Sequence, residues 1–168
     1  FELVAGCFGR DPENTRLTGK ELGLEPSRCY ASWEEMIESE AALPESERIE
    51  AVSIVTPNHV HHGPACTALR AGFHVICDKP LCISLEEALE IKEAVAESGK
   101  TFALTHNYSA SPMVREARER ILAGELGTIR KVYVEYLQGW LSEKLEESGQ
   151  KQADWRTDPT RSGPVGAL

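Results

Sequence analysis

Short apolar segments alternate with capped, helix-like segments along the first hundred residues, and this alternation restricts the fold more than any other feature. Strands are predicted at residues 2–8, 49–55, 73–77 and 101–105, with helices between them and short connections. Strands and helices in alternation are typical of βαβ units, in which helices cover both faces of a parallel sheet. The sequence therefore predicts an α/β fold built on a doubly wound parallel sheet.

Local capping signals fix where the helices begin. Asp11-Pro12 places a good N-cap residue before a proline at the first helical position. Residues 32–35 and 84–87 both match the capping box, in which a serine is followed three residues later by a glutamate. Ser111-Pro112 marks the start of a further helix. These signals support the alternating pattern independently of hydrophobicity.

The pattern changes near residue 108, where we expect a domain boundary between residues 1–108 and 109–168. Residues 128–137 alternate apolar and polar side chains, which predicts a strand with one wet face in an antiparallel sheet. Residues 139–162 are polar and are predicted to form a loop.

Composition narrows the class of protein. A net charge of -9 argues against nucleic acid or an anionic membrane as the main partner. No apolar run approaches the roughly 20 residues that span a bilayer. The five cysteines form no Cys-x-x-Cys pair, which favours reduced thiols and a cytoplasmic location. The chain begins with Phe1 and both ends fall within patterned sequence, so we expect it to be part of a longer protein.

Polar residues follow four of the predicted strands. In a parallel sheet the carboxyl ends of the strands share one edge, and ligands bind at that edge in open α/β sheets. A solvated turn is the alternative for any one of these segments taken alone. The four segments are Gly9-Arg10, Thr56-Pro57-Asn58-His59, Asp78-Lys79-Pro80 and His106-Asn107.

Taken in order, five motifs make essentially the whole chain resemble the Gfo/Idh/MocA oxidoreductases, which include glucose–fructose oxidoreductase and inositol dehydrogenase. Each motif is weak alone, and the ordered set is more specific. The motifs are Thr56-Pro57-Asn58, Asp78-Lys79-Pro80, Asn107-Tyr108, Gly124-Glu-Leu-Gly127-Thr128 and Trp155-Arg156.

The resemblance implies a Rossmann dinucleotide-binding domain over residues 1–108, with its first strand absent from this chain. It further implies that residues 109–168 begin an α/β domain with a largely antiparallel open sheet. Members of the family oxidise or reduce a hydroxyl carbon of a sugar or polyol with NAD or NADP. Separately, an exposed sheet face built from strands such as that at residues 128–137 leads us to expect a homo-oligomer, a dimer or tetramer. The protein is thus expected to be an NAD(P)-dependent dehydrogenase acting on CH-OH groups.

The resemblance also implies roles for individual residues. Lys79 matches the lysine that assists proton transfer at the reacting hydroxyl and contacts the nicotinamide side, and Asp78 stands where glutamate is commoner. Residues 56–59 match the loop along the cofactor. Asn107 matches a polar residue near nicotinamide and substrate, and Trp155-Arg156 matches a segment that approaches the cofactor.

Two parts of the family pattern are absent. The Gly-x-Gly-x-x-Gly phosphate loop would lie before Phe1, and the downstream Asp and His of the proton relay would follow Leu168. The fragment alone is therefore expected to be inactive. A non-catalytic binding or assembly domain is one alternative function. A relative of the family's NAD-dependent glycosidases, in which oxidation is transient, is another.

For Arg10 and for the histidines near residue 60, more than one role is compatible with the sequence. Arg10 follows the first predicted strand, where an arginine accommodates the NADP phosphate or stacks on adenine; a surface arginine is the alternative. His59 and His62 share a helical face but no carboxylate or cysteine completes a ligand set, so no metal is predicted.

Overall fold

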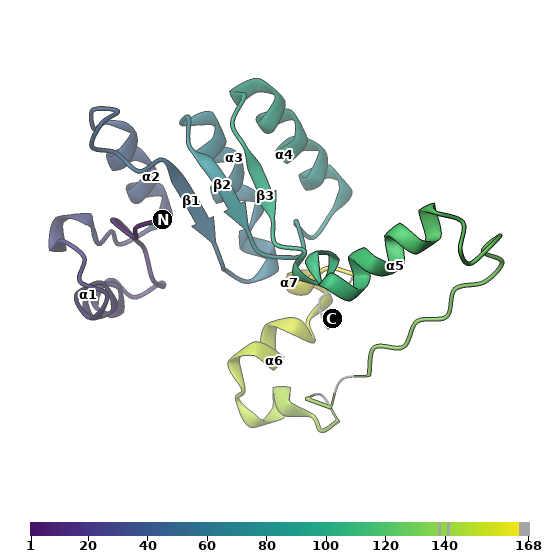
Figure 1. Ribbon diagram of the computed structural model, residues 1–168. Helices are drawn as coiled ribbons and strands as arrows, with labels where there is room; N and C mark the ends of the chain where they lie inside the picture. The colour runs from purple at the N-terminus through teal and green to yellow at the C-terminus, as the bar shows by residue number, and fades with distance from the viewer. Residues whose placement is uncertain (138, 141, 165–168) are drawn as a thin grey trace. The chain divides into compact units, whose positions relative to one another are not determined.

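The computed structural model describes residues 1–137, 139–140 and 142–164. The described residues divide into two compact units, the first over residues 1–104 and the second beginning at residue 105 (Figure 1). The predicted boundary between evolutionary domains at residue 108 stays a prediction.

Three parallel strands form the centre of the first unit. They are β1 (Ala51–Ile54), β2 (His74–Cys77) and β3 (Phe102–Leu104), in that order across the sheet. The register places the last residue of each strand opposite the last residue of its neighbour. The prediction of an α/β fold with a parallel sheet is confirmed, and the carboxyl ends of all three strands share one edge.

The crossover connections are helical. A 3₁₀ turn, η2 (Asn58–Val60), and α3 (His62–Arg70) join β1 to β2, and α4 (Leu85–Ser98) joins β2 to β3. α3 and α4 pack against each other on the same side of the sheet (Figure 1). Two successive crossovers of the same hand, running in the same direction across a sheet, place both helices on one face.

The hydrophobic core lies between this sheet and its helices. Leu69 and Phe73 are 0% exposed, and Val52 and Ile54 of β1 are buried. On the opposite face Ser53 is exposed, as is Ala103 of β3. Among the described residues, α3 and α4 cover one face of the β1–β2–β3 sheet, and Ser53 and Ala103 lie on its other face.

Before β1 the chain forms α1 (Pro12–Glu21), η1 (Pro26–Arg28) and α2 (Trp33–Ala41). The caps predicted for α1 and α2 are confirmed, whereas Ser111 makes no side-chain capping bond at the start of the later helix over residues 112–122. The carboxylate of Asp11 accepts a hydrogen bond from the Glu13 N–H, and the Ser32 hydroxyl accepts one from the Glu35 N–H. Each bond satisfies an amide that the helix itself leaves without a partner.

The strand predicted at residues 2–8 does not form. Gly6 makes a single parallel bridge, in which its N–H donates to the Arg28 carbonyl at 3.0 Å and its carbonyl accepts from the Tyr30 N–H at 2.9 Å. A strand needs a ladder of several such pairs, and the described residues supply one.

A buried carboxylate ties α2 to the segments around it. Glu40 is 0% exposed and accepts hydrogen bonds from the Arg28 guanidinium, from the Tyr30 hydroxyl at 2.8 Å and from the Ile49 N–H at 3.0 Å. Burial alone would raise the pKa of the Glu40 carboxyl, but these hydrogen bonds outweigh it and leave the pKa below its ordinary value. Burial and the bond to Glu40 raise the pKa of Tyr30 to about 12.

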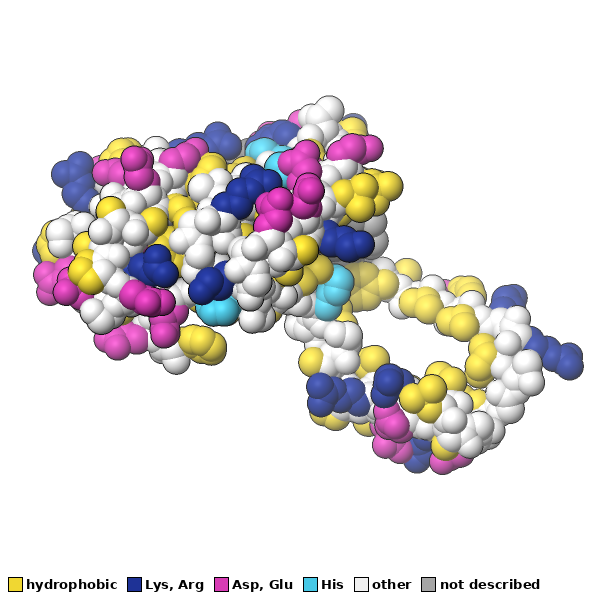
Figure 2. All heavy atoms as spheres, turned by 90° about the horizontal axis from the view of Figure 1, so that it is seen from above, with side chains coloured by type: hydrophobic (Ala, Val, Ile, Leu, Met, Phe, Trp, Pro, Cys, Tyr) yellow, Lys and Arg dark blue, Asp and Glu magenta, His cyan; other side chains and the backbone are white. Residues whose placement is uncertain are grey.

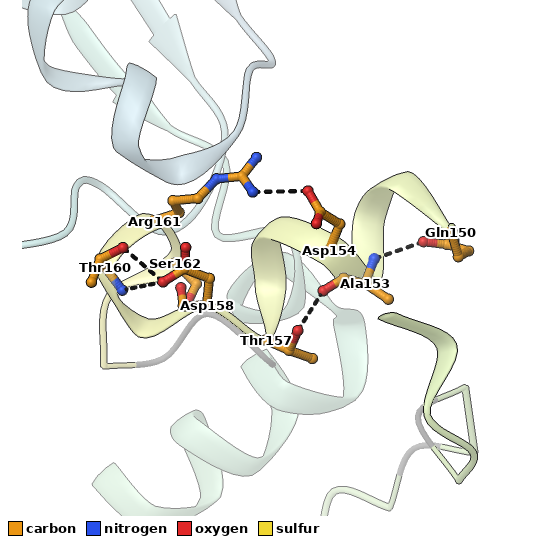
Figure 3. A network of polar contacts seen from close by, with 8 residues as sticks. All are labelled: Gln150, Ala153, Asp154, Thr157, Asp158, Thr160, Arg161 and Ser162. Carbon is orange, nitrogen blue, oxygen red and sulfur yellow. Dashed lines mark hydrogen bonds and ion pairs between the residues drawn. The ribbon is translucent and has the colours of Figure 1, made fainter. Parts of the chain in front are cut away.

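The second unit is helical where it is regular. It contains η3 (Asn107–Ala110), α5 (Pro112–Leu122), η4 (Leu145–Ser148), α6 (Lys151–Arg156) and α7 (Pro159–Ser162). The loop predicted over residues 139–162 therefore contains three helical segments. Local caps account for the starts of α6 and α7, because Gln150 accepts from the Ala153 N–H and Asp158 from the Thr160 N–H (Figure 3).

The strand predicted at residues 128–137 is also wrong. No residue of this segment pairs with another strand in the described part of the chain. Val132 is 75% exposed and Val134 is 79% exposed. Alternation alone does not make a strand, since the backbone groups of a strand need a neighbour to bond. Hydrophobic side chains are correspondingly visible on the surface of this unit (Figure 2).

No helix within the residues that the structure describes combines the length and apolar character that crossing a bilayer requires.

Candidate active site

The turns that follow β1 and β2 lie side by side at the carboxyl edge of the sheet. The N–H of Asp78 donates to the carbonyl of Ile54 at 2.9 Å, which extends the pairing of β1 and β2 by one bond. Residues 56–59 and 78–80 leave the sheet directly after this bond. The structure thus brings together two of the four polar segments that the sequence placed at strand ends.

A buried histidine links these two turns. The ring of His61 is 1% exposed, its Nε2 lies 2.8 Å from the carbonyl oxygen of Thr56, and its Nδ1 lies 2.8 Å from the carbonyl oxygen of Pro80. One side chain therefore contacts the backbone of both turns.

Sequence reasoning did not single out His61 among its neighbouring histidines, although a signal was present. His61 lies four residues before Ala65 and seven before Ala68, and both alanines are 0% exposed. This spacing places all three on one helical face, the face that packs into the core. A histidine on a buried face requires hydrogen-bond partners, which here are the two carbonyls.

The turn that carries Lys79 is shaped by its own acid. The carboxylate of Asp78 accepts a hydrogen bond from the Lys79 N–H at 2.8 Å, and both residues are half-buried. The peptide bond between Lys79 and Pro80 is cis. Asp78 therefore acts on the backbone of the turn as well as supplying negative charge beside the lysine.

The turn after β1 contains both buried and solvent-exposed residues. Asn58 is 4% exposed and Thr56 is exposed. The Nδ1 atom of His59 is buried and has no hydrogen-bond partner among the described residues. A buried ring nitrogen in this position is suited to receive a polar group of a ligand.

Gly9 and Arg10 form an exposed turn between the Gly6 bridge and α1. Gly9 has a φ of 153°, and a Cβ built on it would meet nothing within 4 Å. The carboxylate of Asp11 caps α1, so the acidic residue nearest this turn is engaged by the helix, as predicted. The role assigned to Arg10 stays a prediction.

The remaining predicted site residues belong to the second unit and form their own arrangement. Asn107 is exposed at the start of η3. On α6, the guanidinium of Arg156 lies 4.9 Å from the ring centre of Trp155 and 5.7 Å from that of Trp140. Both distances fit cation–π contacts.

The cysteine beside the candidate site is not poised as a nucleophile. Cys77 ends β2 directly before Asp78 and is 0% exposed. Burial, with a smaller contribution from the Asp78 carboxylate, raises the pKa of Cys77 to about 12. Among the described residues, no group of three or more His, Cys, Asp or Glu side chains is placed to hold a metal ion.

Comparison with known proteins agrees with this arrangement. The sequence profile described as "Oxidoreductase family, NAD-binding Rossmann fold" matches residues 1–106.

The chain belongs to the Gfo/Idh/MocA oxidoreductase family.

Several curated Gfo/Idh/MocA relatives and solved structures are similar to it. The uncharacterized oxidoreductase YfiI of Bacillus subtilis is 37% identical over 98% of this chain, and levoglucosan dehydrogenase of Pseudarthrobacter phenanthrenivorans is 32% identical over 77%. The crystal structure of an inositol dehydrogenase homolog from Azotobacter vinelandii, complexed with NAD+, matches 98% of the chain with a TM-score of 0.91 and 40% identity. A structure of an inositol dehydrogenase homolog from the same organism with NADH and myo-inositol matches 95% with a TM-score of 0.85.

The chain spans only part of these proteins. It covers 41% of YfiI, 31% of levoglucosan dehydrogenase and 41% of the Azotobacter chain solved with NAD+. The Rossmann fold and the family follow from the match itself. The activity and substrate of the whole protein are treated as proposals below.

The turns of this Rossmann domain fit a dinucleotide. The buried Nδ1 of His59 lacks a protein partner, and the space above Gly9 is open. The turns lie at the carboxyl edge of a parallel sheet, which is the edge where dinucleotides bind in this fold. Residues 56–59 and 78–79 could hold part of NAD at this edge, and their assignment stays a prediction.

Proposed function

We propose that the complete protein is an NAD-dependent dehydrogenase that acts on a hydroxyl carbon of a sugar or polyol. The observation that carries this proposal is the pairing of the Lys79 turn with residues 56–59 at one sheet edge, in a chain of this family. The relatives named for levoglucosan and myo-inositol, both polyhydroxylated, support the substrate class.

The bound nicotinamide would supply the hydride acceptor or donor. Residues of this chain would do the remaining work. The ammonium-bearing side chain of Lys79 would exchange a proton with the substrate hydroxyl, and Asp78 would hold the lysine turn through the bond it accepts from the Lys79 N–H. His59 would offer its buried ring nitrogen to the cofactor.

The first test is a titration of the complete protein with NAD+ and with NADP+, followed by a screen of sugars and cyclitols for cofactor reduction. Saturable binding of NAD+ and reduction with at least one polyol would support the proposal. Binding of neither nucleotide would contradict it. A strong preference for NADP+ would instead support the predicted phosphate contact of Arg10.

The second test replaces the lysine. Lys79→Met removes the proton-transfer group while keeping a side chain of similar length, so kcat should fall by about 10²-fold or more with a much smaller change in the NAD+ Kd. Lys92→Met changes an exposed lysine on α4 and serves as the matched control. A kcat for Lys79→Met within a few-fold of the wild type would rule out the assigned role.

A second candidate is an enzyme whose reaction shows no net oxidation. Two relatives support it: 2,7-anhydro-N-acetylneuraminate hydratase of Escherichia coli, 29% identical over 91% of the chain, and the enzyme of the same name from Mediterraneibacter gnavus, 27% identical over 91%. In this case substrate hydrogens would exchange with deuterated solvent without accumulation of reduced cofactor. Net reduction of NAD+ in step with product would favour the dehydrogenase.

A further inference from the structure

We propose that His61 is a positioning residue of the active site: in its imidazolium form it holds the turn of Lys79 at a fixed distance from the turn of Thr56. The proposal rests on the proposed function for its kinetic consequence. Its structural part concerns the described residues of the first unit alone.

The geometry requires two donors on one ring. A backbone carbonyl oxygen accepts hydrogen bonds and has no proton to give, and both partners of the His61 ring are carbonyl oxygens at 2.8 Å. A neutral imidazole has one N–H and one lone pair. The neutral ring would place that lone pair against a carbonyl oxygen, whereas the imidazolium donates to both.

The surroundings of the ring are compatible with a charge. The ring is 1% exposed, and each ring nitrogen of His61 lies 2.8 Å from a carbonyl oxygen, so hydrogen bonds offset part of the cost of burying a charge. The turns on either side carry His59, Asp78 and Lys79 as their titratable groups. On α3 the next residue, His62, is engaged with Glu90 of α4 at 2.9 Å.

The two His61 contacts lie just beyond the last hydrogen bond between β1 and β2. The pairing of β1 with β2 ends at the bond from the Asp78 N–H to the Ile54 carbonyl. Pro80 has no N–H, so its carbonyl is its single backbone group able to make a hydrogen bond. His61 supplies that bond, one residue beyond Lys79.

The second contact of His61, to the Thr56 carbonyl, lies at the start of the turn after β1. The Thr56 carbonyl belongs to the first residue of the segment predicted to run along the cofactor. A shift of about 1 Å between a catalytic group and its reaction partner can cost about 10²-fold in rate. His61 therefore couples the position of the lysine turn to that of the predicted cofactor segment through backbone carbonyls alone.

The protonation of the ring is tested first and needs no activity. NMR of the complete protein with ¹⁵N-labelled histidine, assigned by comparison with His61→Gln, reports whether each ring nitrogen carries a proton at neutral pH. We expect both His61 nitrogens to be protonated. One unprotonated nitrogen in the folded protein would overturn the proposal.

The positioning role is tested by three variants of the complete protein. His61→Leu removes both donors, and we expect kcat to fall by about tenfold or more, with a smaller change in NAD+ Kd. His61→Gln keeps N–H donors and should recover part of that loss. His62→Leu alters the neighbouring histidine and should leave kcat near the wild-type value.

These outcomes separate the two proposals. A wild-type protein that neither binds NAD+ nor turns over would defeat the proposed function, while the NMR result would still decide the state of His61. Equal kcat in His61→Leu and wild type, with both folded by circular dichroism, would overturn the positioning role. Equal losses in His61→Leu and His61→Gln would also do so, because the donors would then be irrelevant.

Discussion

Large apolar side chains are buried in the first unit of this chain and exposed in the second. In the first unit, Phe73 and Leu69 are fully buried beneath a parallel sheet. In the second, Val134 is 79% exposed and Leu137 is 90% exposed, whereas the buried residues there include the small Ala153 and Ser162. The difference lies in the neighbours that each segment finds, since both units contain strand-like patterns.

β1 and residues 128–137 make the point directly. Val52 and Ile54 alternate with exposed Ser53, and residues 128–137 also alternate apolar with polar side chains. β1 pairs with β2 and packs on α3, and the later segment pairs with no described strand. A period of two indicates which side chains would share a face, and a partner decides whether that face is buried.

The largest expected effect on stability comes from comparing a buried apolar residue of the first unit with an exposed one of the second. In the chain of residues 1–168, Phe73→Ala should lower the free energy of unfolding by about 4 kcal/mol, because it empties a fully buried site in the core. Val134→Ala should change it by less than about 0.5 kcal/mol. Urea denaturation of both variants measures the two values. Similar losses would mean that residues 128–137 are packed in solution.

The next effect compares buried and exposed carboxylates. Glu40→Gln removes a charge that accepts from Arg28, Tyr30 and the Ile49 N–H, and it should cost about 2–3 kcal/mol. In the second unit, Asp154 pairs with Arg161 at 2.8 Å with both side chains partly exposed (Figure 3). Asp154→Asn should therefore cost under about 1 kcal/mol. Equal losses of unfolding free energy in Glu40→Gln and Asp154→Asn would contradict the expectation that the buried carboxylate matters more.

Acid should sharpen the same contrast. The pKa of Glu40 in the folded state lies below its ordinary 4.5, so the ionised carboxylate stabilises the fold fully at pH values above 4.5. This contribution is lost as the pH falls through the folded-state pKa. The difference in stability between wild type and Glu40→Gln should thus shrink when urea titrations are moved to progressively more acidic pH. A difference that grows with acid would contradict the assignment.

The smallest effect concerns helix caps. The Ser84 hydroxyl accepts from the Glu87 N–H at 3.2 Å at the start of α4, whereas the Ser111 side chain makes no capping bond at the start of α5. Ser84→Ala should cost about 1 kcal/mol, and Ser111→Ala a few tenths at most. Thermal unfolding of the two variants compares two serines that each stand directly before a helix, of which only Ser84 makes a side-chain capping bond.

Much of the first unit was predictable because its signals are local. Asp11, Ser32 and Ser84 cap helices through bonds to residues two or three positions away, and the structure confirms all three. The same holds for the parallel order of β1, β2 and β3, which follows from strands separated by helices. The ordered motifs also identified the family, which the match over residues 1–106 confirms.

The candidate site was predictable only in outline. The sequence placed residues 56–59 and 78–80 at one sheet edge, and the structure agrees. It did not indicate that His61 would join them, because the choice of partner for a buried side chain depends on which backbone groups the fold brings within reach. For the same reason the sequence did not indicate the bonds of Glu40 to Arg28, Tyr30 and Ile49.

By itself, then, the sequence determined the alternation of strands and helices, the caps and the family, since these depend on neighbours along the chain. The tertiary structure decided the fate of residues 2–8 and 128–137 and the partners of His61 and Glu40. These features depend on hydrogen bonds and contacts between residues distant in sequence, and such bonds form only where folding has already placed both groups.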